Sequence, residues 1–161
     1  MKHQNGLTLL AGLVFTAVFL SAAPNAQAGQ CSLAGVAGKW GFTTSGTIVG
    51  IGPRSSLGIF TLDGAGNLLG GKATASLNGS VTDETFAGTY TVNPDCTGKL
   101  AITISDLAGN KILAATLDLV FDDTVRQLRG IFTSAVLPNG TPLGTVITVD
   151  AKRTFISEEN D

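Results

Sequence analysis

Residues 84–105 read ETFAGTYTVNPDCTGKLAITIS and contain two alternating stretches on either side of a turn. Every second residue in 84–92 and in 99–105 is mostly apolar, as in strands that bury one face. The intervening NPDCTG at 93–98 carries Asn, Pro, Asp and Gly, which are typical of tight turns. This stretch therefore predicts two consecutive antiparallel strands.

The same pattern extends in both directions along the chain. Short stretches rich in Val, Ile, Thr, Leu and Phe alternate with Gly, Asn and Asp clusters, and Asn78-Gly79 is a strong hairpin signal. We expect eight strands, at residues 39–49, 56–62, 68–77, 84–92, 99–105, 111–121, 125–136 and 144–155. The sequence thus predicts an all-β fold, an eight-stranded antiparallel up-and-down meander closed into a barrel, because closure removes the exposed edges. A two-sheet β-sandwich is the alternative.

The N-terminal segment resembles an export signal. Lys2 precedes an apolar run at residues 7–20, which is shorter than the roughly 20 residues of a membrane-spanning helix. The Ala-Gln-Ala sequence ending at Ala28 matches a cleavage site. We expect residues 1–28 to be a cleaved secretory signal peptide, and residues 29–161 to form a single β-barrel domain with a short acidic C-terminal tail. The protein is then periplasmic or extracellular, with no membrane span after cleavage.

Histidine content limits the chemistry. His3 is the one histidine of the chain and leaves with the signal peptide. Ser-His and Cys-His nucleophile pairs and His-ligated zinc are therefore excluded from the mature domain. We expect no catalytic residue, no metal and no cofactor. The formal net charge of -2 also argues against a nucleic-acid partner.

The two cysteines, Cys31 and Cys96, are expected to form a disulfide, since an exported chain meets oxidising conditions. Such a bond would tie the start of the mature chain to the turn at 93–98. There is no Cys-x-x-Cys spacing that would suggest a redox centre.

Strand alternation selects the candidate pocket residues. Phe42, Phe86 and Tyr90 fall on the apolar faces of their strands and are candidates to line a pocket. Asp118 lies in the middle of a predicted strand and is a candidate for a carboxylate in that pocket. The strand at 111–121 is apolar on both faces, which allows self-association through the outside of the sheet.

The sequence Gly38-Lys39-Trp40 resembles the opening of the first strand in calycin barrels, the group of lipocalins, avidins and their relatives. In that family a basic residue of the last strand packs across the Trp and plugs one barrel end. The resemblance implies this role for Trp40 and Arg153, and Arg153 falls on the apolar face of its strand by alternation. Residues 86–98 also look like exported bacterial proteins of unassigned function, which are similar to allene-oxide-cyclase-like barrels. A biotin site lined by several Trp, as in avidins, is not expected with one Trp in the chain.

Three functions remain open from the sequence. The first is non-catalytic binding of a small apolar or amphipathic molecule inside the barrel. The second is a structural or interaction protein with a filled barrel, which associates through its sheet faces. The third is a cyclase- or isomerase-type enzyme, for which Asp118 is the candidate carboxylate. The enzyme carries the least support.

Overall fold

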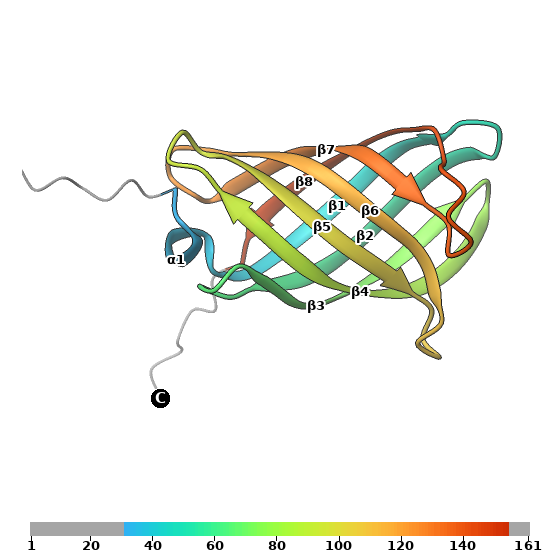
Figure 1. The fold of residues 1–161 in the computed structure, drawn as a ribbon, viewed down its shortest axis with the longest axis horizontal. Coiled ribbons are helices and arrows are strands. Elements are labelled where there is room, and N and C mark those ends of the chain that lie inside the picture. Colours follow the sequence, from blue (N-terminus) through green and yellow to red (C-terminus); the bar gives the residue numbers. More distant parts are fainter. Residues whose placement is uncertain (1–30, 155–161) are drawn as a thin grey trace, which may run out of the picture.

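The computed structural model describes residues 31–154, which form eight antiparallel strands and one short helix. Each strand pairs with the next along the chain and the last pairs with the first, so the sheet is a closed barrel (Figure 1). The strands are β1 (Gly38–Ile48), β2 (Gly52–Leu62), β3 (Asn67–Leu77), β4 (Ser80–Val92), β5 (Thr97–Ser105), β6 (Lys111–Phe121), β7 (Gln127–Val136) and β8 (Thr145–Arg153). The predicted eight-stranded meander is confirmed, and the sandwich alternative is wrong. The proposed signal peptide and the acidic tail lie outside the described residues.

Two strands begin a full four residues earlier than the sequence pattern suggested. β2 begins at Gly52 and β4 at Ser80, four residues before each predicted start. The added segments contain polar and charged residues, which the apolar pattern did not include. The extension of β2 brings Arg54 into the barrel wall, where its side chain is buried.

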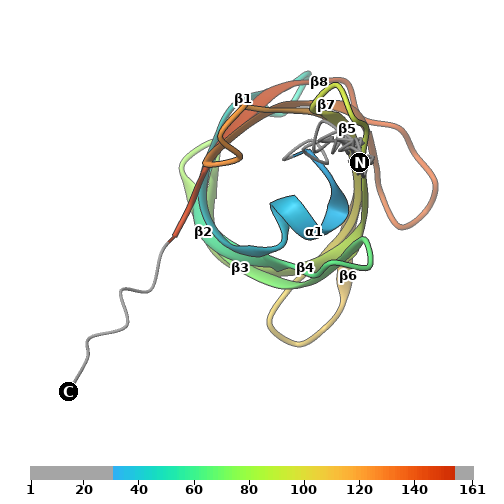
Figure 2. The ribbon, with the colours of Figure 1, turned by 90° about the vertical axis from the view of Figure 1, so that its left-hand side faces the viewer.

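A helix, α1 (Leu33–Val36), precedes the first strand and was not predicted. Four residues are too few to show a helical period. The Ser32 side chain caps the helix by accepting a hydrogen bond from the Gly35 amide at 3.0 Å. Figure 2 looks along the barrel and shows α1 inside the ring of strands at one end.

The two ends of the barrel are therefore different. The closed end contains α1 and the connections β2–β3, β4–β5 and β6–β7. The opposite end, which we call the mouth, is formed by the other four connections, β1–β2, β3–β4, β5–β6 and β7–β8. Within the described residues, α1 is the one helix, and it is far too short to cross a membrane.

Glycines make room for the aromatic core. Gly58 and Gly71 stand opposite Phe42 and Phe86 on neighbouring strands. A Cβ at Gly71 would overlap the Phe86 ring, and a Cβ at Gly58 would approach the Phe42 ring and the Lys72 carbonyl too closely. Glycine at these positions lets large rings fill a narrow barrel.

The outer surface follows the expected alternation, including on β6. Leu113, Leu117 and Leu119 point inward and are buried, whereas Val120 is 57% exposed on the outer face. Ile112 lies at the mouth end of β6, where it is 38% exposed and lines a pocket described below. The apolar residues on both faces of this strand thus divide between the core and the outside.

Candidate functional site

The closed end is held by hydrogen bonds from strand side chains to the backbone of α1. The Trp40 indole is fully buried and donates to the Val36 carbonyl at 3.1 Å. The Arg153 guanidinium donates to the Gly35 carbonyl at 3.0 Å and to the Ala37 carbonyl. Carbonyls at a helix C-terminus lack partners within the helix, so a cation there is favourable. The structure thus places Trp40 and Arg153 at the closed end, both bound to the helix that fills it.

The closed end also contains the disulfide. Cys31 is bonded to Cys96, with 5.0 Å between their Cα atoms. The bond joins the residue just before the Ser32 cap to the β4–β5 turn. It therefore anchors the start of the described chain to the barrel wall.

Tyr90 also forms a hydrogen bond at the closed end. Its hydroxyl lies 3.1 Å from the Leu33 carbonyl and also within hydrogen-bond distance of the Asp63 carbonyl in the β2–β3 turn. Burial raises the pKa of the Tyr90 phenol to about 12, with a further contribution from the negative charge of Asp63. The ring lines the interior cavity, but the hydroxyl is engaged at the closed end, so it is not available as a donor to a molecule in the barrel.

The interior of the barrel contains a small apolar cavity. Phe42, Phe60 and Phe86 surround it, with ring centroids 5.5 to 6.4 Å apart. Its volume of about 50 Å³ is roughly a third of the ~150 Å³ cavity that holds benzene in another protein. In this conformation the interior accommodates water-sized molecules only.

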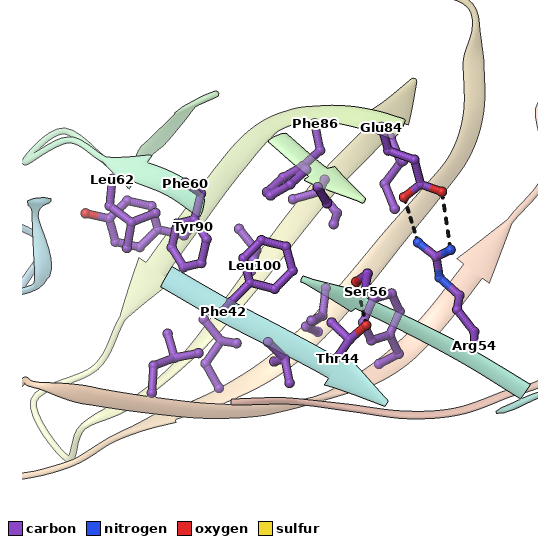
Figure 3. A pocket seen from close by; sticks show the side chains of 18 residues that line it. Phe42, Thr44, Arg54, Ser56, Phe60, Leu62, Glu84, Phe86, Tyr90 and Leu100 are labelled. Atoms are coloured by element: carbon purple, nitrogen blue, oxygen red, sulfur yellow. Dashed lines mark hydrogen bonds and ion pairs between the residues drawn. The ribbon is translucent and has the colours of Figure 1, made fainter. Parts of the chain in front are cut away.

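A buried ion pair lies at the mouth side of this cavity. Arg54 and Glu84 make two hydrogen bonds, Nη1 to Oε1 at 3.2 Å and Nη2 to Oε2 at 2.7 Å. Their side chains are only 10% and 8% exposed. Figure 3 shows this pair and Tyr90 at opposite ends of the cavity. The two charges are thus removed from water and satisfy each other in a bidentate arrangement.

Next to the ion pair, two hydroxyls bind each other inside the barrel. Thr44 and Ser56 are both buried, and their side-chain oxygens are 2.6 Å apart (Figure 3). Each hydroxyl carries one proton, and the hydrogen bond between the two side chains uses one of these protons. The pair therefore adds a hydroxyl donor to the polar layer that Arg54 and Glu84 begin.

Above this layer a second, larger pocket opens at the mouth. Its volume is about 290 Å³. Ile and Leu side chains form most of its wall, and its polar lining residues are Arg54, Ser80, Thr82 and Glu84. Arg54 and Glu84 line both the mouth pocket and the interior cavity, so their ion pair separates the two spaces.

The expectation that Asp118 lines the pocket is wrong. Asp118 lies on the outer face of β6, where its carboxylate accepts a hydrogen bond from the Lys99 ammonium at 2.6 Å. Its side chain is 52% exposed. From Leu113 to Phe121 the odd-numbered residues of β6 are the buried ones, so Asp118 lies on the other, outer face. The cyclase or isomerase alternative thereby loses its proposed carboxylate.

The sequence interpretation found part of the pocket and missed its charged layer. Phe42, Phe86 and Tyr90 do line the interior cavity. Arg54 and Glu84 were not proposed as site residues, although Glu84 shares the alternation of Phe86 and Tyr90. The same rule, extended back from Phe60 along β2, would have placed Arg54 inside.

Metal ligands do not cluster in the part of the chain that the structure describes. Within residues 31–154, no group of three or more His, Cys, Asp or Glu side chains is placed to hold a metal ion. The turn aspartates bind their own loops instead, as where the Asp63 carboxylate accepts the Ala65 and Asn67 amides. The hydrogen bonds from Asn67 hold the pKa of Asp63 below its usual value.

Comparisons with known proteins support the fold. No protein-family model matches the sequence, and no curated protein matches it. The solved structure of EF1p2_mFAP2b bound to DFHBI is similar, with 17% identity and a TM-score of 0.52, over 74% of this chain and 94% of that one. The S-type phycobiliprotein lyase CPES from Guillardia theta aligns with 10% identity and a TM-score of 0.42, over 75% and 89% of the two chains. The likeness to EF1p2_mFAP2b is one of fold, and the fold of this chain is a closed eight-stranded antiparallel barrel.

Proposed function

We propose that this chain is an exported, non-catalytic binding protein that takes up a small apolar or amphipathic molecule through the mouth of its barrel. The observation that carries the proposal is the mouth pocket of about 290 Å³, which has apolar walls and a polar floor. Ligand sites are concave, mostly apolar and contain a few well-placed polar groups. The pocket matches this description at the low end of the usual size range, ~300 Å³.

The sizes of the two spaces favour the mouth pocket as the place of the ligand. The interior cavity of about 50 Å³ is too small for an organic molecule in this conformation. The molecule therefore occupies the mouth pocket, with its polar end against Arg54 and Glu84. The fold is compatible with this use, since the similar barrel EF1p2_mFAP2b has been solved with DFHBI bound.

Export is supported by the disulfide. Bonds such as Cys31–Cys96 persist in oxidising compartments and are rare in the cytosol. Intact-mass measurement of the protein recovered outside the cytoplasm of its own host tests the proposal. We expect a chain that begins at Gly29, and an uncleaved chain found in the cytoplasm would contradict it.

Binding is tested with N-phenyl-1-naphthylamine, an uncharged dye that fluoresces in apolar surroundings. We expect saturable binding of one dye per chain. Ile112→Glu places a charge in the mouth pocket and should weaken binding at least about tenfold. Val120→Glu is the matched control, because Val120 lies on the same strand but outside the pocket. Absence of saturable binding, or equal binding by wild type and Ile112→Glu, would refute the proposal.

A filled barrel that acts through its surface is the second candidate. The small interior cavity favours it, as do the exposed side chains of Leu57, Ile59 and Leu69, which lie on the neighbouring strands β2 and β3. Sedimentation velocity decides this point. A concentration-dependent dimer that Ile59→Lys abolishes would support association through this face, whereas a strict monomer at all concentrations would contradict it.

A further inference from the structure

We infer that the mouth pocket selects uncharged ligands, namely molecules with an apolar body and one hydroxyl or amide group that can both donate and accept hydrogen bonds. This inference rests on the proposed function and adds the chemical class of the ligand. Its basis is the Arg54–Glu84 pair, which forms the floor of the pocket.

The floor of the pocket carries charges that compensate each other. The guanidinium of Arg54 and the carboxylate of Glu84 meet in two parallel hydrogen bonds. Among the described residues that line the mouth pocket, these two are the charged ones. A ligand in the pocket thus faces a site with no net charge.

The pair nevertheless offers hydrogen bonds of both kinds. A guanidinium has five N–H donors, and two of those of Arg54 are directed at Glu84. A carboxylate has about four acceptor positions, so Glu84 also retains acceptor capacity. A hydroxyl or amide group can donate to Glu84 and accept from Arg54 at the same time. It leaves the ion pair intact.

A charged head group fits this floor poorly. An anion would be attracted by Arg54 but repelled by Glu84, which lies within hydrogen-bond distance of the same guanidinium. A cation would be attracted by Glu84 but repelled by Arg54. In either case the charged group of the ligand would lose its hydration without gaining a counter-charge of its own. If the ligand separated the ion pair, the other charge of the pair would be left buried alone.

The apolar wall strengthens this selection. Ile48, Leu113 and Leu143 are among the Ile and Leu residues that surround the floor. Apolar walls lower the local dielectric constant, which increases the cost of an unpaired charge. They also favour the hydrocarbon or aromatic part of a ligand. Head-group charge is therefore the property by which the pocket discriminates.

Three probes with the same naphthalene body test the inference: 2-naphthalenemethanol, 2-naphthoate and 2-naphthylmethylammonium. Their affinities are measured near neutral pH by displacement of N-phenyl-1-naphthylamine or by calorimetry. We expect the alcohol to bind wild-type protein at least about tenfold more tightly than either ion. An ion that binds as tightly as the alcohol would overturn the inference and leave the proposed function standing. If none of the probes and no dye binds, the proposed function itself fails.

Variants of Arg54 and Glu84 then test whether the ion pair is the source of the selectivity. Glu84→Gln frees Arg54 from its counter-charge, so it should shift the preference toward naphthoate by at least about tenfold. Arg54→Gln should shift the preference toward the ammonium probe by the reverse argument. Lys99→Gln is the matched control, because it breaks an exposed ion pair on the outer wall, and it should leave all three affinities unchanged. Variants that fold, as judged by circular dichroism, yet keep the wild-type ratios between the three affinities would overturn the assignment.

Discussion

The two ends of the barrel use polar groups in different ways. At the closed end, Trp40, Tyr90 and Arg153 all reach backbone carbonyls of α1 or a neighbouring turn, and the Cys31–Cys96 bond joins the segment before α1 to the wall. At the mouth, the buried Arg54 and Glu84 bind each other through their side chains, below a pocket of about 290 Å³. Backbone acceptors hold the side chains of the closed end in one arrangement, whereas a side-chain pair can exchange partners.

We therefore expect changes at the closed end to affect stability and changes at the mouth to affect ligand binding as well.

The largest effect is expected from the disulfide. Replacing both cysteines, Cys31→Ala and Cys96→Ala, removes a link between residues 65 positions apart. Restricting a loop of this length lowers the entropy of the unfolded chain, so its loss should reduce the free energy of unfolding by about 4 kcal/mol. Urea unfolding followed by Trp40 fluorescence measures this change. Affinity for the dye should be unaltered in the folded variant, and a change below about 1 kcal/mol would show that the closed end does not depend on the bond.

At the mouth, replacing one residue of the ion pair is expected to lower the free energy of unfolding more than replacing both residues. Glu84→Leu leaves the Arg54 guanidinium buried without a counter-charge and should destabilise the fold by about 3 kcal/mol. Adding Arg54→Met removes that charge and should recover most of the loss. A double-mutant cycle in urea measures the coupling between the two residues. With the Arg54→Met single variant completing the cycle, additive losses from the two replacements would mean that the pair is not coupled in solution.

Arg153 provides the comparison at the closed end. Arg153→Met removes the hydrogen bonds to the Gly35 and Ala37 carbonyls, and should cost about 2 kcal/mol. Arg153→Lys keeps a charge near those carbonyls and should cost less. Neither change should alter dye affinity, because Arg153 is bound to the carbonyls of Gly35 and Ala37 at the closed end and does not line the mouth pocket. A loss of affinity in either variant would show that the two ends are coupled.

The fold was predictable because strand alternation and turn residues are local signals. The stretch at 84–105 contains both, and β4 and β5 form around it. Alternation also placed Phe42 and Phe86 inside. The helix α1 was missed, since its formation depends on the Ser32 cap and on acceptors that Trp40 and Arg153 satisfy from distant strands.

The charged layer was not predicted for a different reason. Arg54 and Glu84 lie 30 positions apart and meet across β3, so neither residue indicates its partner locally. Asp118 lies in the middle of a predicted strand, but the alternation on β6 places it outside, whereas Glu84 begins its predicted strand and faces inward. A buried pair of this kind can be inferred from the sequence only when every inward position is examined, polar residues included.

The smallest effect is expected at Tyr90, and it depends on pH. Tyr90→Phe removes one hydrogen bond at the closed end and should cost about 1 kcal/mol near neutral pH. Tyr90 is the one tyrosine of the chain, so ultraviolet titration of the folded protein reports its pKa directly. We expect the phenol to ionise near 12, because burial raises its pKa from the ordinary 10.0.

This pKa shift gives the stability a definite pH dependence. Between pH 10 and 12 the unfolded chain loses the phenolic proton while the folded chain keeps it. The unfolded state then binds fewer protons, so the free energy of unfolding falls as pH rises through this window. The contribution of the protonated Tyr90 phenol to the free energy of unfolding is fully present below pH 10 and is lost as the pH rises through the pKa of the folded state. Tyr90→Phe lacks this titration, so its deficit relative to wild type should shrink across the window. Parallel stability curves for the two proteins would show that burial does not raise the pKa of Tyr90 in the folded protein.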